Sequence, residues 1–337
     1  MNTALSIKTA ALAALCLLAP AAPAAAMPIY GNNDYLPVSG YAARSTLAKL
    51  ADSTVSFFRA RDIGPGGEVV ANTLGKAYDL CKDDPFFSSP TVGFCSGVLV
   101  EPDVVLTAAH CLKDGCDGVK IVFGYVSKEP RFVLPPENVY GCKAVLAGPR
   151  EIPDGDIALV KLDRKAAGRT PIGISDAKIE PGMRLASIGH PKGMPQQIQP
   201  DVRVLLVAEG YDFFVTDMDS LGGQSGSPVF DQSGRVLGVH FSAIGALSGD
   251  NLVTDIKGQC FRFGALKENE WVDRSRLPED PKYDAMAVSD TAGNRSVPVA
   301  SSAVAVAPAL KKHLAPKAGA VSLPKLPSVG VKARGRF

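Results

Sequence analysis

The chain has 337 residues and a formal net charge of +2, a balance that by itself identifies no charged partner. Beyond an N-terminal leader, no stretch is long and apolar enough for a membrane helix, which excludes a membrane span. Without the leader and a polar tail, roughly 230 residues remain, enough for one sizeable hydrophobic core.

The N-terminus has the features of a secretory signal over residues 1–26. Lys8 supplies the positive charge, residues 11–19 form the apolar core, and small residues lead to a cleavage site after Ala26. We therefore expect a secreted or periplasmic protein. Residues 27–45 follow as a loose N-terminal arm or pro-segment.

The central part of the chain, residues 46–272, has the pattern of an all-β domain. A first strand is expected within residues 45–58, and residues 61–90 resemble a long loop or insertion. Runs rich in β-branched residues, separated by Gly, Pro, Asp and Asn clusters, predict further short strands. They cover residues 96–100, 103–108, 119–126, 156–162, 184–189, 202–208, 213–216, 227–230 and 235–241. Because helical periods are scarce, a β-barrel or sandwich is favoured.

Residues 273–337 are expected to form a disordered basic tail. From Thr291 to Phe337 there are eight Lys or Arg residues and no Asp or Glu, with much Ala, Val, Pro and Ser. Such a segment buries too little surface to offset the entropy of ordering it. We expect a chain that ends near Asp290 to keep its activity, and the tail to attract anionic surfaces only weakly.

A serine in a glycine-rich bend is the first candidate for chemistry. Residues 219–230 read DSLGGQSGSPVF, with Ser225 between glycines. A serine hydroxyl is a poor nucleophile and needs a base, together with donors that stabilise the oxyanion. Glycines allow backbone N–H groups to converge on one point. Many surface turns contain Gly and Ser, so this interpretation depends on the presence of partners.

Two other residues have the chemistry that such a serine requires. His110 ends an apolar strand in TAAHC and is the candidate base. Asp156 enters the apolar run DIALVKL and is the candidate acid that orients the imidazole. Asp154 lies in a Pro-Asp-Gly turn and is better explained as a turn residue.

Six cysteines remain when Cys16 of the leader is left out, and an even number in an exported protein indicates disulfides. The chain has no CxxC pair and its four histidines do not cluster, so we expect no metal and no cofactor. Cys95 precedes Cys111 by 16 residues, and a disulfide between them would fix the turn that holds His110.

The other four cysteines allow three pairings. We favour Cys116–Cys142, because these residues flank two segments that would then be adjacent strands. This choice leaves Cys81–Cys260 as a long-range tie between the early loop and the end of the domain.

Together, TAAHC, DIAL and GQSGSP make residues 46–269 resemble the trypsin/chymotrypsin-like serine endopeptidases. The resemblance implies two packed six-stranded antiparallel β-barrels with the active site in the cleft between them. It implies that Ser225 is acylated by the substrate, that His110 acts as base and then acid, and that Asp156 orients His110. Backbone N–H groups of Gly223 and Ser225 would form the oxyanion hole.

The same resemblance implies protein or peptide substrates, and we expect a monomer that binds no specific nucleic acid. An inactive protease-fold binding protein is the alternative from another class, although such proteins usually lose one of the three catalytic residues. His190 is expected to have a structural role after a strand, and His313 to be solvated in the tail.

The serine motif is more similar to that of bacterial glutamyl endopeptidases (V8-like) than to that of animal digestive enzymes. In the animal enzymes, an aspartate directly before the serine receives the N-terminal ammonium that forms on activation. Here Gln224 occupies that position, so we do not expect the same activation switch.

Residues of the expected specificity pocket point to two different substrates. In glutamyl enzymes, a histidine fifteen residues after the serine and a hydroxyl five residues before it bind the substrate carboxylate; here these are His240 and Ser220. We therefore predict a preference for Glu before the cleaved bond. Asp219 lies six residues before Ser225, where trypsin-like enzymes bind Arg or Lys, which is the alternative. Asp219 can also point away from the pocket, or hold His240 in its cationic form and raise its pKa.

Overall fold

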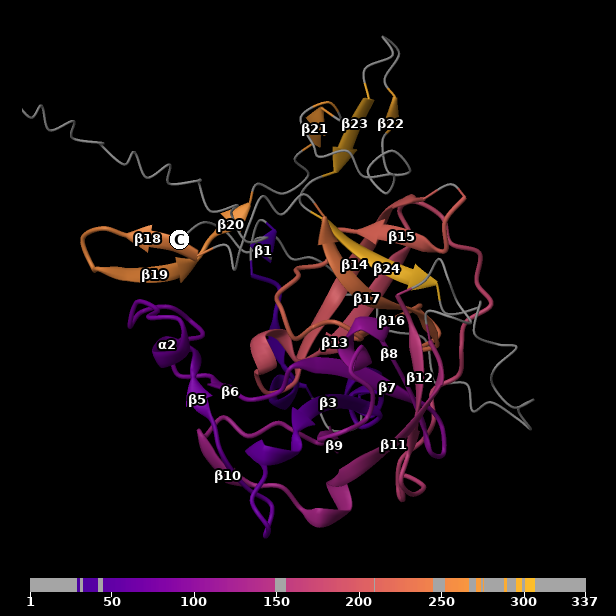
Figure 1. Cartoon of the computed structure of the whole chain (residues 1–337). Coiled ribbons are helices and arrows are strands. Elements are labelled where there is room, and N and C mark those ends of the chain that lie inside the picture. The colour runs from indigo at the N-terminus through magenta and orange to yellow at the C-terminus, as the bar shows by residue number, and fades with distance from the viewer. Residues whose placement is uncertain are drawn as a thin grey trace, which may run out of the picture.

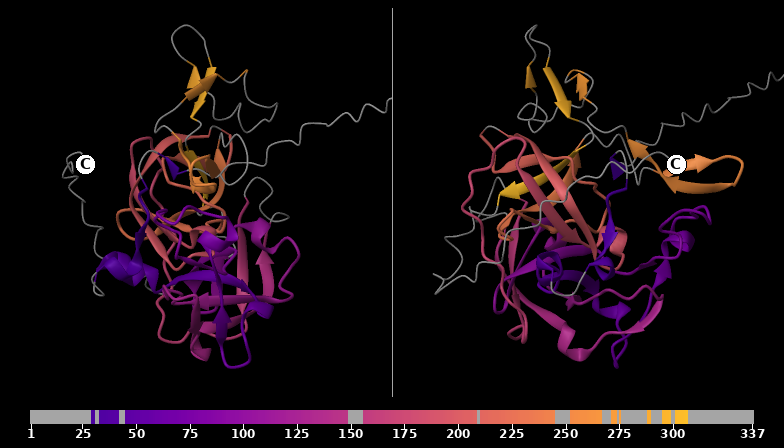
Figure 2. Two further views of the ribbon diagram at one scale, coloured as in Figure 1. Left: turned by 90° about the vertical axis from the view of Figure 1, so that its left-hand side faces the viewer. Right: turned by 180° about the vertical axis from the view of Figure 1, so that it is seen from behind.

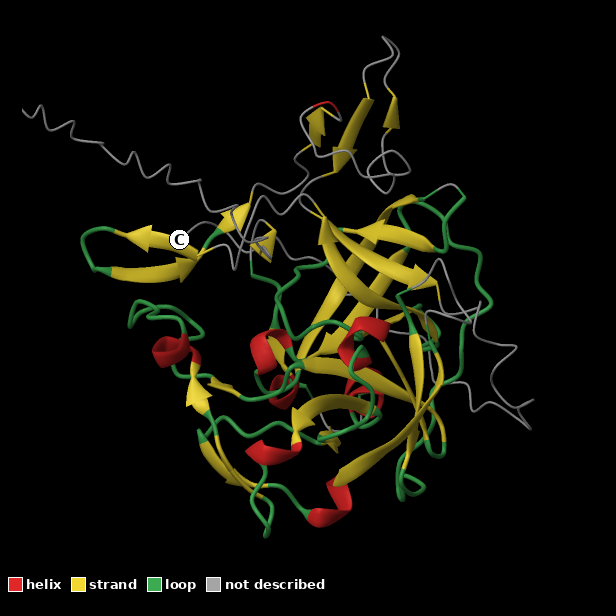
Figure 3. Ribbon diagram, in the orientation of Figure 1, coloured by secondary structure: helices red, strands yellow, loops and turns green. Residues whose placement is uncertain are grey.

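Strands dominate the structure and the helices are short (Figure 3). The computed structural model describes residues 29–30, 33–41, 45–148, 156–208, 210–244, 252–266, 271–273, 275, 288–289, 295–298 and 301–306. The all-β prediction is confirmed. In this described part of the chain, no helix has the length and apolarity needed to cross a bilayer. The predicted leader, residues 1–26, lies outside the described residues.

The first half of the fold is a closed barrel of six antiparallel strands, in the order β11-β12-β8-β7-β3-β9 (Figure 1). The strands are β3 (Thr54–Arg59), β7 (Cys95–Glu101), β8 (Val104–Thr107), β9 (Val119–Phe123), β11 (Val139–Ala147) and β12 (Ala158–Leu162). Alternate residues of these strands point inward, and Phe57, Leu99 and Ile121 are fully buried there.

A second ring of six antiparallel strands follows. It consists of β13 (Arg184–Gly189), β16 (Pro228–Phe230), β17 (Val236–Ile244), β24 (Ser301–Val306), β15 (Phe213–Thr216) and β14 (Gln197–Val207), in this order. β14 pairs back with β13 and so closes the ring, while β2 (Leu36–Pro37) adds to β14 from outside. This architecture agrees with the predicted pair of six-stranded barrels.

The two barrels share an apolar cluster. It includes Val98 and Leu106 from the first barrel and Ile188 and Phe230 from the second, and all four side chains are fully buried. The short helix α1 (Thr46–Ala51), which leads into β3, adds further apolar side chains to it. Residues on strands of both barrels are therefore held in a fixed relation to each other.

Strand β24 contradicts the prediction that the chain is disordered from residue 273 onward. It lies between β15 and β17, and Val304 is opposite Phe214 on one side and His240 on the other (Figure 1). Val304 is fully buried. Composition did not predict this strand, because β24 is ordered by its two neighbours, β15 and β17. They supply its hydrogen-bond partners and its apolar contacts, and the local sequence of residues 301–306 shows neither.

Smaller elements surround the barrels (Figure 2). The remaining helical turns are η1 (Val38–Gly40), η2 (Ala60–Asp62), α2 (Leu74–Ala77), η3 (Ala109–Leu112), η4 (Pro136–Asn138) and η5 (Pro191–Gly193). The remaining strands are β1 (Ile29–Tyr30), β4 (Glu68–Val70), β5 (Asn72–Thr73), β6 (Pro90–Thr91), β10 (Arg131–Val133), β18 (Leu252–Asp255), β19 (Cys260–Phe263), β20 (Ala265–Leu266), β21 (Trp271–Asp273), β22 (Val288–Ser289) and β23 (Arg295–Pro298). The expected insertion over residues 61–90 thus contains short strands and a helix. The described part of the N-terminal segment, which we expected to be loose, contributes β1 and β2.

The disulfides of the structure are the three that the sequence predicted. They join Cys81 to Cys260, Cys95 to Cys111 and Cys116 to Cys142, with Cα–Cα distances of 5.0, 6.2 and 5.1 Å. The segments beside Cys116 and Cys142 form β9 and β11, which are adjacent antiparallel strands as predicted.

We predict that a chain ending at Asp290 loses its second barrel, in contrast to the expectation from composition. Without β24, the facing edges of β15 and β17 lose their hydrogen-bond partners and the core is opened. We expect the free energy of unfolding to fall by about 5 kcal/mol or more, which is comparable to the whole stability of a small domain. Urea denaturation of this chain and of a matched chain ending at residue 310, which keeps β24, measures the difference. Equal midpoints for the two chains would contradict a role for β24.

Candidate active site

The end of β8 brings His110 and Asp156 together. Thr107 on β8 lies opposite Ala158 on β12, so the residues just before β12 reach the helical turn η3 that carries His110. His110 Nδ1 is 2.5 Å from Asp156 Oδ2, and the His110 backbone N–H donates to Asp156 Oδ1 at 2.8 Å. Because a carboxylate accepts at Nδ1, the other ring nitrogen is left to take a proton.

The environment of Asp156 favours its charged form. Burial of the carboxyl would raise its pKa. The hydrogen bond from the His110 ring, the charge of that ring and backbone N–H donors outweigh the burial and hold the pKa below its ordinary value. Asp156 is therefore ionised at neutral pH and can stabilise an imidazolium at His110.

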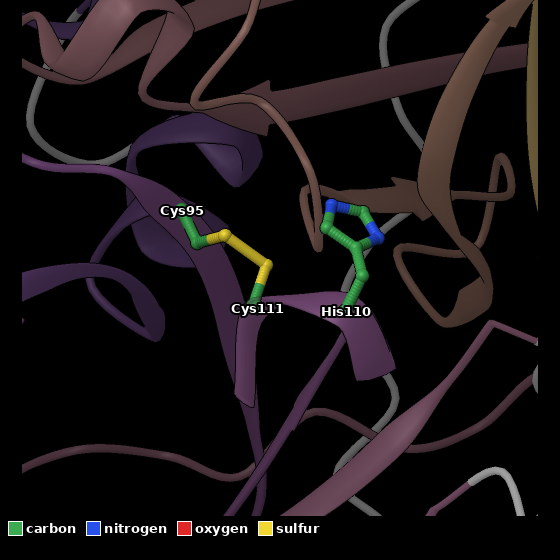
Figure 4. Close-up of side chains that lie close together, drawn as sticks. All are labelled: Cys95, His110 and Cys111. Carbon is green, nitrogen blue, oxygen red and sulfur yellow. A yellow bond between two sulfur atoms is a disulfide. The ribbon is translucent and has the colours of Figure 1, made fainter. Parts of the chain in front are cut away.

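A disulfide fixes the turn that carries His110. Cys111, the next residue of η3, is bonded to Cys95 at the start of β7, and Figure 4 shows the disulfide and the imidazole side by side. In the chain-entropy model, closing a loop of this length stabilises the fold by about 3 kcal/mol. Because the two sulfur atoms are bonded to each other, neither is a thiolate that could bind a metal beside His110.

Ser225 lies between β15 and β16 of the second barrel, but a residue of the first barrel holds its loop. The N–H of Ser96 on β7 donates to the Ser225 carbonyl at 2.8 Å, and the Ser96 hydroxyl donates to the Gly223 carbonyl at 3.0 Å. The same hydroxyl oxygen accepts from the His190 N–H at 2.9 Å. Thr107 in turn donates its hydroxyl to the Ser96 carbonyl at 2.6 Å.

Close backbone approach at Gly226 brings the Ser225 loop against the end of β8, directly before the turn that carries His110. Gly226 has φ +84°, and a Cβ there would lie 2.1 Å from the Ser96 carbonyl oxygen and 3.0 Å from the Ala108 nitrogen. Cys111 Sγ, one residue after His110, is 3.7 Å from the Ser225 carbonyl oxygen. The sequence-predicted serine, histidine and aspartate thus come from three segments that meet where the barrels join.

Two backbone donors in the Ser225 loop have no acceptor among the described residues. Within the described part of the chain, the N–H groups of Gly223 and Ser225 make no hydrogen bond, whereas the N–H of Gln224 between them donates to the Leu221 carbonyl at 3.1 Å. Gly223 has φ +88°, a conformation that favours glycine. The loop therefore presents two N–H groups beside the serine.

The predicted pocket residues Ser220 and His240 are in contact. Ser220 Oγ lies 2.9 Å from His240 Nε2, and both residues are buried. His240 lies on β17, and its carbonyl accepts from the Gly226 N–H at 2.7 Å, one residue after Ser225. Burial lowers the pKa of His240 to about 4. The histidine is therefore neutral at pH 7, and the idea that Asp219 holds it in the cationic form is wrong.

Asp219 is fixed by contacts away from the histidine. Its Oδ2 accepts from the Asp34 N–H at 3.0 Å, and its backbone N–H and carbonyl bond to the side chain of Gln199 on β14 at 2.8 and 3.1 Å. The residue is 1% exposed. Sequence reasoning found neither Gln199 nor Ser96, because each looks like an ordinary strand residue and its role depends on loops distant in sequence.

His190 has the structural role predicted for it. It follows β13, its ring stacks on Tyr125 with centroids 5.6 Å apart, and its Nδ1 lies 3.0 Å from the Met194 carbonyl oxygen. Burial lowers its pKa to about 4.

Comparison with a family model agrees with this geometry. Residues 95–239 match the model of the Trypsin-like peptidase domain. The matched segment contains His110, Asp156 and Ser225. The match to this domain model and the two-barrel fold support a serine peptidase.

Individual relatives are distant. Over 109 residues the chain is 32% identical to Granzyme-like protein 2 of Rattus norvegicus, and this alignment spans 30% of the chain and 41% of that protein. Similar solved structures include the serine endoprotease of Yersinia pestis (14% identity, TM-score 0.40, 66% of this chain and 62% of that chain). They also include human heparin-binding protein (16%, 0.39, 60% and 84%) and the MamO protease domain of Magnetospirillum magneticum (12%, 0.41, 80% and 98%).

We predict that acid destabilises the protein through the buried histidines His190 and His240. Both have a pKa of about 4 in the fold and an ordinary value of 6.5, so the unfolded chain binds more protons as the pH falls from 6.5 to 4. Each histidine should cost up to about 3 kcal/mol of stability across this window. Urea denaturation at pH 7.5 and pH 4.5 tests this. The variants His190→Gln and His240→Gln should each reduce the pH dependence, whereas a wild type with equal stability at both pH values would refute the assignment.

Proposed function

We propose that the protein is a secreted serine endopeptidase that cleaves peptide bonds through an acyl-enzyme on Ser225. His110 is the general base and then the general acid, and Asp156 orients and stabilises it. The observation that carries this proposal is the two-point contact of Asp156 with His110, beside a serine loop with two available N–H donors.

The chemistry follows from these positions. As Ser225 Oγ attacks the substrate carbonyl carbon, His110 takes the hydroxyl proton, and the N–H groups of Gly223 and Ser225 stabilise the oxyanion. His110 then gives that proton to the leaving amine, and the acyl-enzyme forms. A water molecule, deprotonated by His110, hydrolyses the ester and restores the free serine.

The compartment is part of the proposal. Three disulfides are typical of extracellular or periplasmic proteins. We further propose that residues 1–26 direct export and are removed after Ala26, on the basis of their charge and apolar pattern.

We expect Ser225→Ala and His110→Ala each to lower kcat on a peptide substrate by about 10⁶-fold, and the double variant to be little worse, because both residues serve one step. Labelling by a fluorophosphonate, which reacts with an activated serine, should be lost in Ser225→Ala. Wild type that is neither labelled nor active on a broad peptide library would instead favour the binding-protein alternative.

We further propose a preference for Glu before the cleaved bond. Ser220 Oγ and His240 Nε2 are in contact, and a substrate carboxylate that reached this pair could accept hydrogen bonds from both. Asp219 gives the alternative preference for Arg or Lys. Its Oδ2 already accepts a backbone N–H, which weighs against this alternative.

We predict the highest kcat/KM for Glu among peptides that differ only in Glu, Asp, Arg, Lys or Leu at this position. His240→Val should lower kcat/KM for the Glu peptide by about tenfold or more, the contribution of one charge-assisted hydrogen bond, and so remove the preference. Fluorophosphonate labelling of this variant should persist. If wild type favours Arg tenfold and Asp219→Ser abolishes that preference, the basic alternative is correct.

A further inference from the structure

The N-terminal arm, defined here as residues 33–41, is fastened to the second barrel. Its strand β2 pairs with the start of β14, and the Val38 N–H donates to the Gln196 carbonyl at 3.2 Å. Tyr35, directly before β2, is only 6% exposed. The arm therefore enters the interior of the molecule at this residue.

Two successive arm residues bind the two ends of residues 219–224. The Asp34 N–H donates to Asp219 Oδ2 at 3.0 Å, and the Tyr35 hydroxyl donates to Gln224 Oε1 at 2.5 Å. Asp219 and Gln224 are each 1% exposed. This segment contains the pocket hydroxyl and one of the two available N–H donors, and it ends directly before the serine.

The side chain of Gln224 links Tyr35 to the backbone of the loop. Its Oε1 also accepts from the Leu221 N–H at 3.3 Å, while its own N–H donates to the Leu221 carbonyl. The one side chain thus closes the turn that contains Gly223. The orientation of the Gly223 and Ser225 peptide groups depends on this turn.

The tyrosine ring is itself held in place. It packs edge-on against Phe86 with centroids 6.3 Å apart and belongs to a buried cluster with Leu74, Met194 and Leu221. The hydroxyl is therefore presented to Gln224 by a ring with little freedom to move, which makes its hydrogen bond an effective constraint on the loop.

We propose that Tyr35 is a positioning residue for catalysis: through Gln224 it holds the N–H donors of Gly223 and Ser225 in place. This inference rests on the proposed peptidase function. The donor is an internal, uncharged phenol, so the contact does not need a newly formed N-terminal ammonium. It does require that the arm from Tyr35 onward stays attached in the active enzyme.

The first test compares two hydroxyl deletions in the same arm. Tyr35→Phe keeps the packed ring and removes the bond to Gln224, which then has one donor fewer in a buried site. We expect kcat to fall about 10- to 100-fold, with KM changed less than about threefold, because oxyanion stabilisation acts in the transition state. Tyr41→Phe is the matched control, because the Tyr41 hydroxyl bonds to no other described residue. Its kcat should stay within about twofold of wild type.

A double-mutant cycle tests whether Tyr35 acts through Gln224. Gln224→Met removes the acceptor and keeps the length of the side chain. If the two residues act as one contact, adding Tyr35→Phe to Gln224→Met should lower kcat by less than about twofold. Independent, multiplicative losses would overturn the proposal, as would an unchanged kcat in Tyr35→Phe.

A separate measurement does not depend on the variants folding. Edman sequencing of the fluorophosphonate-labelled, purified protein should give an N-terminus at or before Tyr35. An active species that begins after Tyr35, and therefore lacks its hydroxyl, would overturn the proposal while leaving the peptidase function intact. Absence of labelling and turnover in wild type would instead reject the peptidase function.

Discussion

The arrangement of the site depends on the hydrogen bonds of one buried serine, Ser96. It lies on a strand of the first barrel, yet its N–H and hydroxyl hold the carbonyl groups of Ser225 and Gly223, which belong to the second. Each of these groups would be costly to bury without a partner. The contacts that satisfy the buried backbone are therefore also the contacts that bring the serine loop to the barrel that carries His110.

The second barrel is completed late in the chain. Its fourth strand around the ring, β24, is separated from β17 by more of the chain than any other neighbouring pair in sequence order. Strand β17, which carries His240, therefore remains an edge strand until β24 pairs with it. Formation of this barrel joins segments that are distant in sequence, which makes its assembly costly in loop entropy. The first barrel has no such dependence, because all six of its strands lie between residues 54 and 162.

The sequence predicted what local chemistry and pattern encode. Strands such as β13 and β15 were placed at their observed ends, because each is an apolar run between turn residues. The three disulfide pairs and the proximity of His110 to Asp156 were also predicted. The functions of Ser96 and Tyr35 were not predictable, because a lone serine or tyrosine has no periodic signal and its partner is set by the tertiary fold. Strand β24 was missed for the same reason.

The Cys81–Cys260 disulfide affects how the molecule responds to proteolytic cleavage. The bond closes a ring of chain that contains His110, Asp156, Ser225 and His240. A single proteolytic cut in any exposed loop of that ring opens the polypeptide but leaves its two pieces joined through sulfur. The protein can therefore be cut once within the ring and remain one molecule until a reductant separates the pieces.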